Sequence, residues 1–228
     1  MRKNYAVLAL MGFLGACGGS STESSSSAAE VPQETPLASG PVVAFMGDSI
    51  TQYWGGGAPA YPTIPITTLV PGSIDAGVAG DTTDQMQQRF ASDVLSQNPD
   101  IVVILGGTND LRLYESPSID NIAAMADAAA TAGIHVVIGT VPPSELWLGS
   151  TFLTQAETGP AIGRFNSQLV QLAFAQGYTL VDYWSAMVNA DGSPNENLFL
   201  SDHIHPNADG YAVMWAVLRP VLVKVEAQ

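Results

Sequence analysis

The sequence predicts a doubly wound α/β fold, in which helices cover both faces of a parallel sheet of about five strands. Short apolar runs rich in β-branched residues recur along the chain, and their hydrophobicity is continuous rather than alternating. Such continuity is typical of strands buried on both faces. Segments with helical spacing of apolar residues lie between these runs, and strands that alternate with helices form doubly wound sheets.

The predicted strands follow one another through the chain without an internal repeat. They cover residues 41–46, 100–105, 134–139 and 178–182, and residues 73–78 are a weaker candidate for a fifth. Ligands in such sheets bind beyond the carboxyl ends of the strands. The residues that directly follow these runs are therefore the candidates for a functional site.

Four of the intervals carry apolar residues at helical spacing. The first begins at a capping box formed by Thr82 and Gln85. The next two end at Gly133 and Gly177, and the last precedes Pro220. Glycine and proline are common just beyond the end of a helix, so these positions mark the expected helix ends.

The first 40 residues do not belong to the folded domain, which we expect over residues 41–228. Residues 1–16 join two basic residues to an apolar stretch that is too short to span a bilayer but suits a signal peptide. Residues 17–40 are rich in glycine, serine and proline and cannot bury enough apolar area to fold. We expect them to form a flexible tether.

Cys17 is the only cysteine of the chain, and it follows Leu14-Gly15-Ala16. This segment resembles the bacterial lipobox, in which a cysteine at the cleavage point receives a diacylglycerol. An ordinary signal peptide with an incidental cysteine is the alternative, but it does not explain why the sole cysteine lies there. We therefore expect an exported protein that a lipid on Cys17 anchors in the bacterial cell envelope, on its periplasmic or outer-surface face, without disulfides in the folded domain.

The charge of the chain excludes several classes of partner. The formal net charge is −14, and removal of the signal peptide leaves 5 basic against 21 acidic residues, a charge of −16. Lysine and arginine form no cluster, so an electrostatic grip on nucleic acid or on anionic lipid headgroups is not expected. We expect a neutral small-molecule substrate, no nucleic-acid partner, and a membrane contact through the lipid anchor alone.

A serine and a histidine with a nearby carboxylate lie toward opposite ends of the domain. Ser49 follows the first predicted strand, and Asp202 stands three residues before His205. A serine nucleophile needs a base within hydrogen-bond reach and a third group that orients the base. We expect His205 to be the base and Asp202 its orienting carboxylate. His203 is the other candidate for the base, but because it is adjacent to Asp202 we expect its side chain to point away from that carboxylate. His135 lies within a predicted strand, and we expect it to have a structural role.

Acyl transfer also requires donors for the negative charge that develops on the carbonyl oxygen. The candidates are the backbone N–H groups of Ser49 and Gly80 and the side-chain amide of Asn109, each a few residues beyond a predicted strand. Gly80 suits close approach because it lacks a Cβ. Taken singly, Asn109 could be a turn residue and Gly80 a helix-entry glycine. Asp48 and Asp110 flank these positions, and we expect capping or turn roles for both.

The sequence Asp-His-Ile-His at residues 202–205 also allows a metal site. Zinc catalysis needs about three protein ligands. The chain has only three histidines, one of them in a distant strand, and no cysteine besides Cys17. We therefore expect no metal and no cofactor.

These blocks resemble the signature of the SGNH (GDSL) hydrolase superfamily. The blocks are Gly47-Asp48-Ser49-Ile50-Thr51, Gly80, Gly107-x-Asn109 and Asp202-x-x-His205, within residues 41–225. The resemblance implies a flavodoxin-like, three-layer α/β/α domain, Ser49 as nucleophile and oxyanion donor, Gly80 and Asn109 as further oxyanion donors, and Asp202 and His205 as the rest of the triad. The chain looks most similar to the platelet-activating-factor-acetylhydrolase-like and carbohydrate acetylesterase branches, and it lacks the Gly-x-Ser-x-Gly motif of α/β-hydrolase lipases.

We expect an envelope-anchored serine esterase that removes short acyl groups, chiefly acetyl, through an acyl-enzyme. A lysophospholipase or thioesterase is the alternative if the insertions at residues 53–62 and 142–157 build a deep groove for a long chain. The alternative of another class is an inactive ligand-binding lipoprotein, against which the intact Ser49, Asn109, Asp202 and His205 argue.

Overall fold

The structure is a computed structural model. It describes residues 35–38, 40–56, 64–113, 119–146, 150 and 153–227. The predicted signal peptide, Cys17 and most of the predicted tether lie outside these residues, as do parts of both insertions. Within the described ranges no helix is both long enough and apolar enough to cross a membrane.

Five parallel strands form one sheet in the order β2-β1-β3-β4-β5. The strands are β1 (Val43–Gly47), β2 (Ile74–Gly77), β3 (Ile101–Leu105), β4 (His135–Gly139) and β5 (Thr179–Val181). This is the strand order of flavodoxin-like sheets, with the topological switch point between β1 and β3. The predicted fold class is confirmed, and each of the five predicted runs contains a strand.

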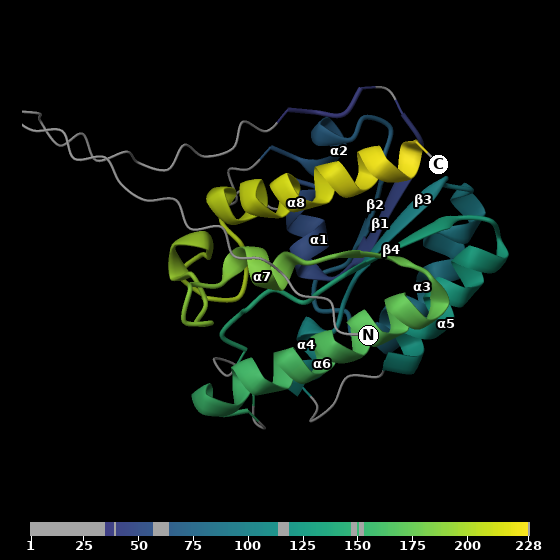
Figure 1. The fold of residues 1–228 in the computed structure, drawn as a ribbon. Coiled ribbons are helices and arrows are strands. Elements are labelled where there is room, and N and C mark those ends of the chain that lie inside the picture. The colour runs from purple at the N-terminus through teal and green to yellow at the C-terminus, as the bar shows by residue number, and fades with distance from the viewer. Residues whose placement is uncertain are drawn as a thin grey trace, which may run out of the picture. The chain divides into compact units, whose positions relative to one another are not determined.

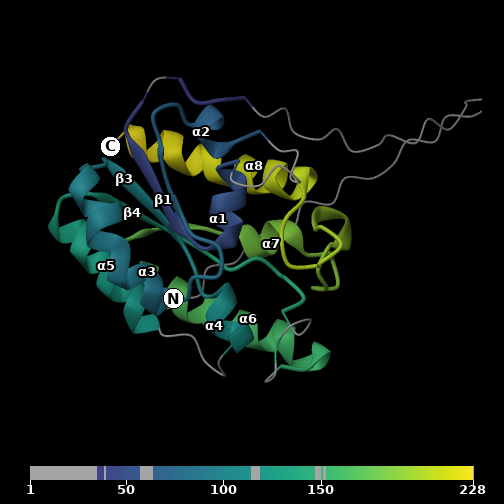
Figure 2. The same cartoon turned by 180° about the vertical axis from the view of Figure 1, so that it is seen from behind.

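Helices cover both faces of the sheet, which gives three layers (Figures 1 and 2). One face packs against α3 (Thr83–Asp93), α5 (Ile119–Thr131) and α6 (Gln155–Gln176), and the other against α1 (Ser49–Trp54), α2 (Ile66–Leu69), α7 (Tyr183–Met187) and α8 (Ala208–Glu226). In β1, Ala44 and Met46 enter the first core, and Val43 and Phe45 enter the second. Both faces of the strand are thus buried, which explains its continuous hydrophobicity.

The predicted capping box and glycine ends agree with the structure, but the last helix does not end before Pro220. The box of Thr82 and Gln85 starts α3, and Gly177 ends α6 with φ +73°. Helix α8 continues through Pro220 to Glu226. Proline removes one intrahelical hydrogen bond, but Leu222, two residues further on, is fully buried in the core. The apolar face therefore extends past the proline and holds the helix together.

The carboxyl ends of the strands gather the four sequence blocks at one rim of the sheet. Ser49 begins α1 directly after β1, Gly80 follows β2, and Asn109 lies in α4 (Thr108–Leu113) directly after β3. His205 comes after β5, at the far end of the sheet from β2. The chain returns toward β1 through α7, the short helix η2 (Glu196–Leu198) and the bridge between Phe199 and Pro206.

Candidate active site

Ser49, His205 and Asp202 form one hydrogen-bonded line. The Nε2 atom of His205 lies 2.9 Å from the Ser49 hydroxyl, although 156 residues separate the two in the chain. The Nδ1 atom of the same ring lies 2.6 Å from Oδ2 of Asp202. If Nδ1 carries the proton that is donated to the carboxylate, Nε2 can accept the proton of the serine. The structure therefore brings together the three residues that the sequence placed in one triad.

Asp202 is fixed by a local turn as well as by the histidine ring. Its Oδ1 atom accepts hydrogen bonds from the backbone N–H groups of Ile204 (2.9 Å) and His205 (3.0 Å). Partial burial raises the pKa of Asp202, but the hydrogen bonds from the His205 ring and from these two backbone groups outweigh it, so the pKa lies below its ordinary value. A carboxylate that stays ionised can orient the ring and stabilise an imidazolium.

The two other histidines lie away from the serine. His203 has a left-handed backbone with φ +57°, and its Nδ1 atom lies 3.5 Å from a carboxylate oxygen of Glu145. His135 is the first residue of β4, at the end opposite the rim, and its Nε2 atom lies 2.9 Å from the Thr179 hydroxyl. Burial lowers the pKa of His135. Both placements agree with the choice of His205 as the histidine near Ser49.

The loop that carries His205 is pinned to the segment after β4. The backbone N–H of Glu145 donates to the carbonyl of His203 (2.8 Å), and the hydroxyl of Ser144 donates to the carbonyl of Ile204 (3.0 Å). Ser144 is fully buried at this contact. These bonds hold the backbone of the loop against the segment that follows β4.

The three candidate oxyanion donors line one small pocket of about 200 Å³. The lining residues are Ser49, Tyr53, Ala79, Gly80, Thr108, Asn109, Arg112, Ile204 and His205. The amide of Asn109 donates one hydrogen to the backbone carbonyl of Asp81 at 2.9 Å, and an amide has a second hydrogen to offer. Asn109 thus joins the turn after β2 to the helix after β3, and it retains a donor for a ligand.

Glycine at position 80 is required by the backbone rather than by crowding. Gly80 has φ +89°, a conformation that residues with a Cβ rarely adopt, yet a Cβ built there would meet no atom within 4 Å. Gly107 is different, because its φ is +116° and a Cβ would also collide with the ring of Phe165. Position 107 must be glycine for α4 to pack against α6.

The two aspartates that flank the site act as helix caps, as expected. Asp48 precedes α1, and its Oδ1 atom accepts the backbone N–H of Ile50 at 2.9 Å. Complete burial raises the pKa of Asp48 from 3.8 to about 7. Asp110 accepts the backbone N–H of Thr83 at 2.9 Å and so caps α3 from a different helix. Burial raises the pKa of Asp110 as well.

Sequence reasoning missed Arg89, which ties three parts of the rim together. Its Nε atom lies 2.6 Å from Oδ2 of Asp81, directly after Gly80. Its two terminal nitrogens donate to the backbone carbonyl of Ala76 in β2 (2.7 Å) and to that of Gly47 in β1 (2.8 Å). The only signal in the sequence was an isolated arginine two helical turns after an aspartate, which is also common on solvated helices.

Two tyrosines lie near the nucleophile, and the first of them, Tyr53, belongs to the insertion at residues 53–62 that was expected to shape the substrate site. The ring of Tyr53 lies 4.9 Å from the ring of His205 and forms part of the pocket wall. The hydroxyl of Tyr211 donates to the carbonyl of Ile50 at 2.8 Å, and its ring stacks on Trp54 at 5.4 Å. No role in the site was predicted for Tyr211, which holds the helix that begins with Ser49.

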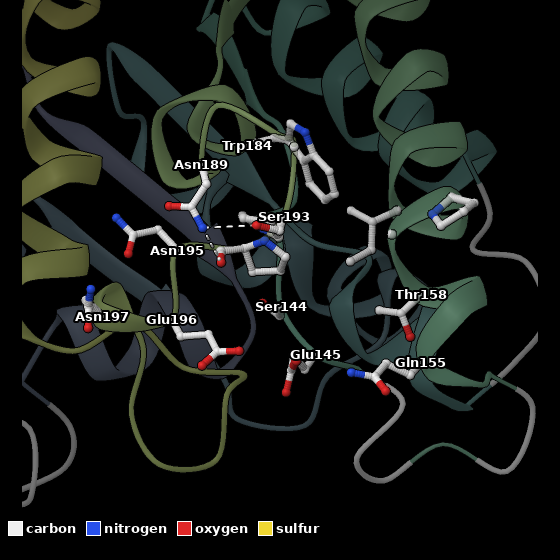
Figure 3. Close-up of a pocket in the computed structure, with 16 residues that line it drawn as sticks. Ser144, Glu145, Gln155, Thr158, Trp184, Asn189, Ser193, Asn195, Glu196 and Asn197 are labelled. Carbon is white, nitrogen blue, oxygen red and sulfur yellow. Dashed lines mark hydrogen bonds between the residues drawn. The ribbon is translucent and has the colours of Figure 1, made fainter.

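A second cavity of about 580 Å³ is lined in part by Ser144 and Glu145, the residues that hold the His205 loop (Figure 3). Its wall is largely polar, with Trp184 and Asn189 on one side and the carboxyl groups of Glu145 and Glu196 on the other (Figure 3). The possible ligand atoms of Glu145, Glu196 and His203 lie within 4.8 Å of one another. These three could approach a metal ion, but neither Ser49 nor His205 belongs to the group.

Comparison with known proteins gives a family match over most of the chain. Residues 45–213 match the sequence profile of the GDSL-like Lipase/Acylhydrolase family. The chain is also 27% identical over 198 residues to an uncharacterized lipoprotein, YqeF, of Bacillus subtilis (strain 168), and the match covers 74% of this chain and 81% of that protein.

Solved structures of similar fold include two hydrolases. A GDSL-like lipase from Bacteroides thetaiotaomicron VPI-5482 superimposes with a TM-score of 0.67 and 29% identity, over 82% of this chain and 92% of that one. An acetyl xylan esterase from Geobacillus stearothermophilus superimposes with a TM-score of 0.62 and 18% identity, over 84% of this chain and 96% of that one. At this identity the second similarity concerns the fold alone.

Proposed function

Since the chain belongs to the GDSL-like lipase/acylhydrolase family and is a carboxylic-ester hydrolase, we propose that it cleaves short-chain esters, chiefly acetyl esters, with Ser49 as nucleophile. The observation that carries this proposal is the unbroken line from the Ser49 hydroxyl through His205 to Asp202, with distances of 2.9 and 2.6 Å. At its serine end, this line of hydrogen bonds reaches the pocket that Gly80 and Asn109 also line.

In the proposed mechanism, His205 removes the proton of Ser49 as its oxygen attacks the ester carbonyl. The oxygen of the tetrahedral intermediate accepts hydrogen bonds from the backbone N–H groups of Ser49 and Gly80 and from the amide of Asn109. His205 then donates its proton to the departing alcohol, which leaves an acyl-enzyme. A water molecule, deprotonated by the same ring, hydrolyses the acyl-enzyme, while Asp202 stabilises the positive charge of the ring.

The size of the pocket supports a short acyl group. A volume of about 200 Å³ is below the roughly 300–1,000 Å³ of pockets for drug-sized ligands. Acetyl esters are the first candidates because acetyl is the smallest of the common acyl groups. No metal is required in this scheme, so we expect a chelator to leave activity unchanged.

The experiment that tests the proposal is a series of p-nitrophenyl esters with acyl chains from C2 to C12. We expect the highest kcat/KM between acetyl and butyryl and a steep fall by C8. In a fully apolar groove each added CH₂ would contribute about 0.8 kcal/mol, and kcat/KM would rise along the series instead. A maximum at C8 or beyond would replace the acetylesterase by a lysophospholipase or thioesterase, and hydrolysis of none of the esters would favour a ligand-binding lipoprotein.

We also propose that the mature protein begins at Cys17, carries a lipid there, and is held in the cell envelope. The lipobox-like Leu14-Gly15-Ala16 before Cys17 supports this, as does similarity to a Bacillus subtilis protein named as a lipoprotein. Cys17→Ser should abolish partition into the detergent phase of Triton X-114 and incorporation of labelled palmitate. An intact protein with an unmodified thiol at Cys17 would refute the anchor.

A further inference from the structure

Arg112 lies in the wall of the pocket that contains Ser49. It stands three residues after Asn109 in the short helix α4, and residues three apart lie on the same face of a helix. Arg112 and Asn109 therefore reach the same pocket from one element. No role was predicted for Arg112, because lysine and arginine form no cluster in the chain.

The guanidinium of Arg112 is without a partner in the described part of the protein. Its Nε atom is buried and makes no hydrogen bond, and none of the ion pairs found among the described residues includes Arg112. Arg89 differs, since it satisfies all three of its nitrogens with carboxylates and carbonyls. A buried polar group without a partner needs a functional explanation, particularly in a chain with 21 acidic residues that could have paired with it.

The chemistry of the group indicates what would bind there. Guanidinium remains charged at all ordinary pH values, and its planar fork of N–H donors fits a carboxylate or a phosphate. The other residues of the pocket wall carry no carboxylate. Among the described residues, no acidic side chain lines this pocket, so an anion there would lie close to the cation of Arg112 rather than to a carboxylate.

We propose that Arg112 is a specificity-determining residue that binds a carboxylate or phosphate group carried by the ester substrate close to the scissile bond. This proposal rests on the proposed function, since it assumes that esters are cleaved at Ser49. It revises the neutral substrate that the net charge suggested. The anionic group is on the acyl chain, as in a dicarboxylic half-ester, or on the alcohol.

Matched pairs of esters separate these two positions. For the acyl side, p-nitrophenyl hemisuccinate is compared with p-nitrophenyl butyrate. For the alcohol side, 4-acetoxybenzoate and 4-acetoxyphenyl phosphate are compared with 4-acetoxybenzamide. The quantity measured is the ratio of kcat/KM for the anionic ester to kcat/KM for its neutral partner.

Arg112→Gln should lower this ratio about 10- to 100-fold in at least one pair, because a charge-assisted hydrogen bond is lost. Arg164→Gln is the matched control, because it removes the same charge from an exposed position of α6 and should leave the ratios unchanged. Arg112→Lys keeps the charge without the fork and should retain part of the preference. In the wild type, the preferred anionic ester should lose rate with added NaCl more steeply than its neutral partner.

Equal ratios in the wild type and Arg112→Gln for all pairs would overturn the proposal, and so would an equal fall of the ratio in Arg164→Gln. If Arg112→Gln does not fold, the wild-type ratios and Arg112→Lys decide, and a wild type that disfavours every anionic ester refutes the inference. The proposed function fails separately. If Ser49→Ala hydrolyses the neutral esters as fast as the wild type, the assignment of Ser49 as nucleophile is wrong. If cleavage requires Ser49 but the ratio does not depend on Arg112, only the inference about Arg112 is wrong.

Discussion

Asp48→Asn should stabilise the protein at neutral and alkaline pH. Asp48 is completely buried directly before Ser49. Its Oδ1 atom caps α1, whereas its Oδ2 atom faces the hydroxyl of Thr108 without making a hydrogen bond. Asparagine caps helices as well as aspartate does. The substitution therefore keeps the cap, removes a buried negative charge, and gives the Thr108 hydroxyl a donor.

The expected magnitude follows from the pKa of Asp48, which burial raises from 3.8 to about 7. The folded state then binds more protons than the unfolded state between these two values. The contribution of Asp48 to stability is therefore most favourable below about pH 4, decreases as pH rises through about 7, and is constant above it. A shift of about 3 pKa units corresponds to about 4 kcal/mol, so Asp48→Asn should exceed the wild type by up to that amount at pH 8 and by little at pH 4.

The free energy of unfolding is measured by urea denaturation from pH 4 to pH 8.5 in both proteins. In the wild type it should decrease across this range more steeply than in Asp48→Asn. Asp191→Asn is a suitable control, because hydrogen bonds to Ser193 lower the pKa of this exposed carboxyl and its loss should act in the opposite direction. If Asp48→Asn is less stable than the wild type at pH 8, the buried carboxylate is stabilising and the reasoning is wrong.

Three further predictions concern the rim. Ser49→Ala and His205→Ala should each lower kcat by about 10⁴ or more, because triad residues act as a unit. If His203→Ala abolished activity and His205→Ala were tolerated, His203 would be the base and the assignment of His205 would be wrong. Asn109→Ala should lower kcat by roughly 10²–10³ with little change in KM, because its amide bonds the oxyanion more strongly than the ground-state carbonyl, and an unchanged kcat would remove it from the site. Arg89→Met should reduce the free energy of unfolding by about 3 kcal/mol, since it leaves the mostly buried Asp81 unpaired, and a loss below about 1 kcal/mol in urea denaturation would show that the pair is screened.

The sheet could be predicted because each buried strand needs apolar residues on both faces, and that requirement is visible in a run such as Ile101-Val102-Val103-Ile104-Leu105. The rim could be predicted because the carboxyl ends of parallel strands coincide, so Ser49, Gly80 and Asn109 had to lie near one another. Neither argument needs the contacts of individual side chains. Sequence position and topology were sufficient.

The contacts that hold the site could not be predicted in the same way. Arg89 reaches the carbonyl of Gly47, which is 42 residues away in the chain, and Tyr211 reaches that of Ile50, which is 161 residues away. Such bonds depend on where helices cross the sheet, and many polar residues on amphipathic helices face solvent instead. The predicted end of α8 was wrong for a related reason. Burial of Leu222 outweighs the tendency of Pro220 to end a helix.

The residues at the strand ends, Ser49 and Asn109, and the loop of Asp202 and His205 are held by different kinds of contact. Ser49 and Asn109 are buried at the ends of the central strands β1 and β3. Arg89 locks the turn after Gly80 to β1 and to the neighbouring edge strand β2. The side chain of Asp202, in contrast, is 40% exposed and lies in a loop whose backbone carbonyls accept hydrogen bonds from Ser144 and Glu145. The side chains of Ser49 and Asn109, which belong to the proposed oxyanion site, are thus buried, whereas the proposed selectivity depends on Arg112 in the pocket wall. A substitution at Arg112 can therefore alter which ester is bound while the geometry of bond cleavage is retained.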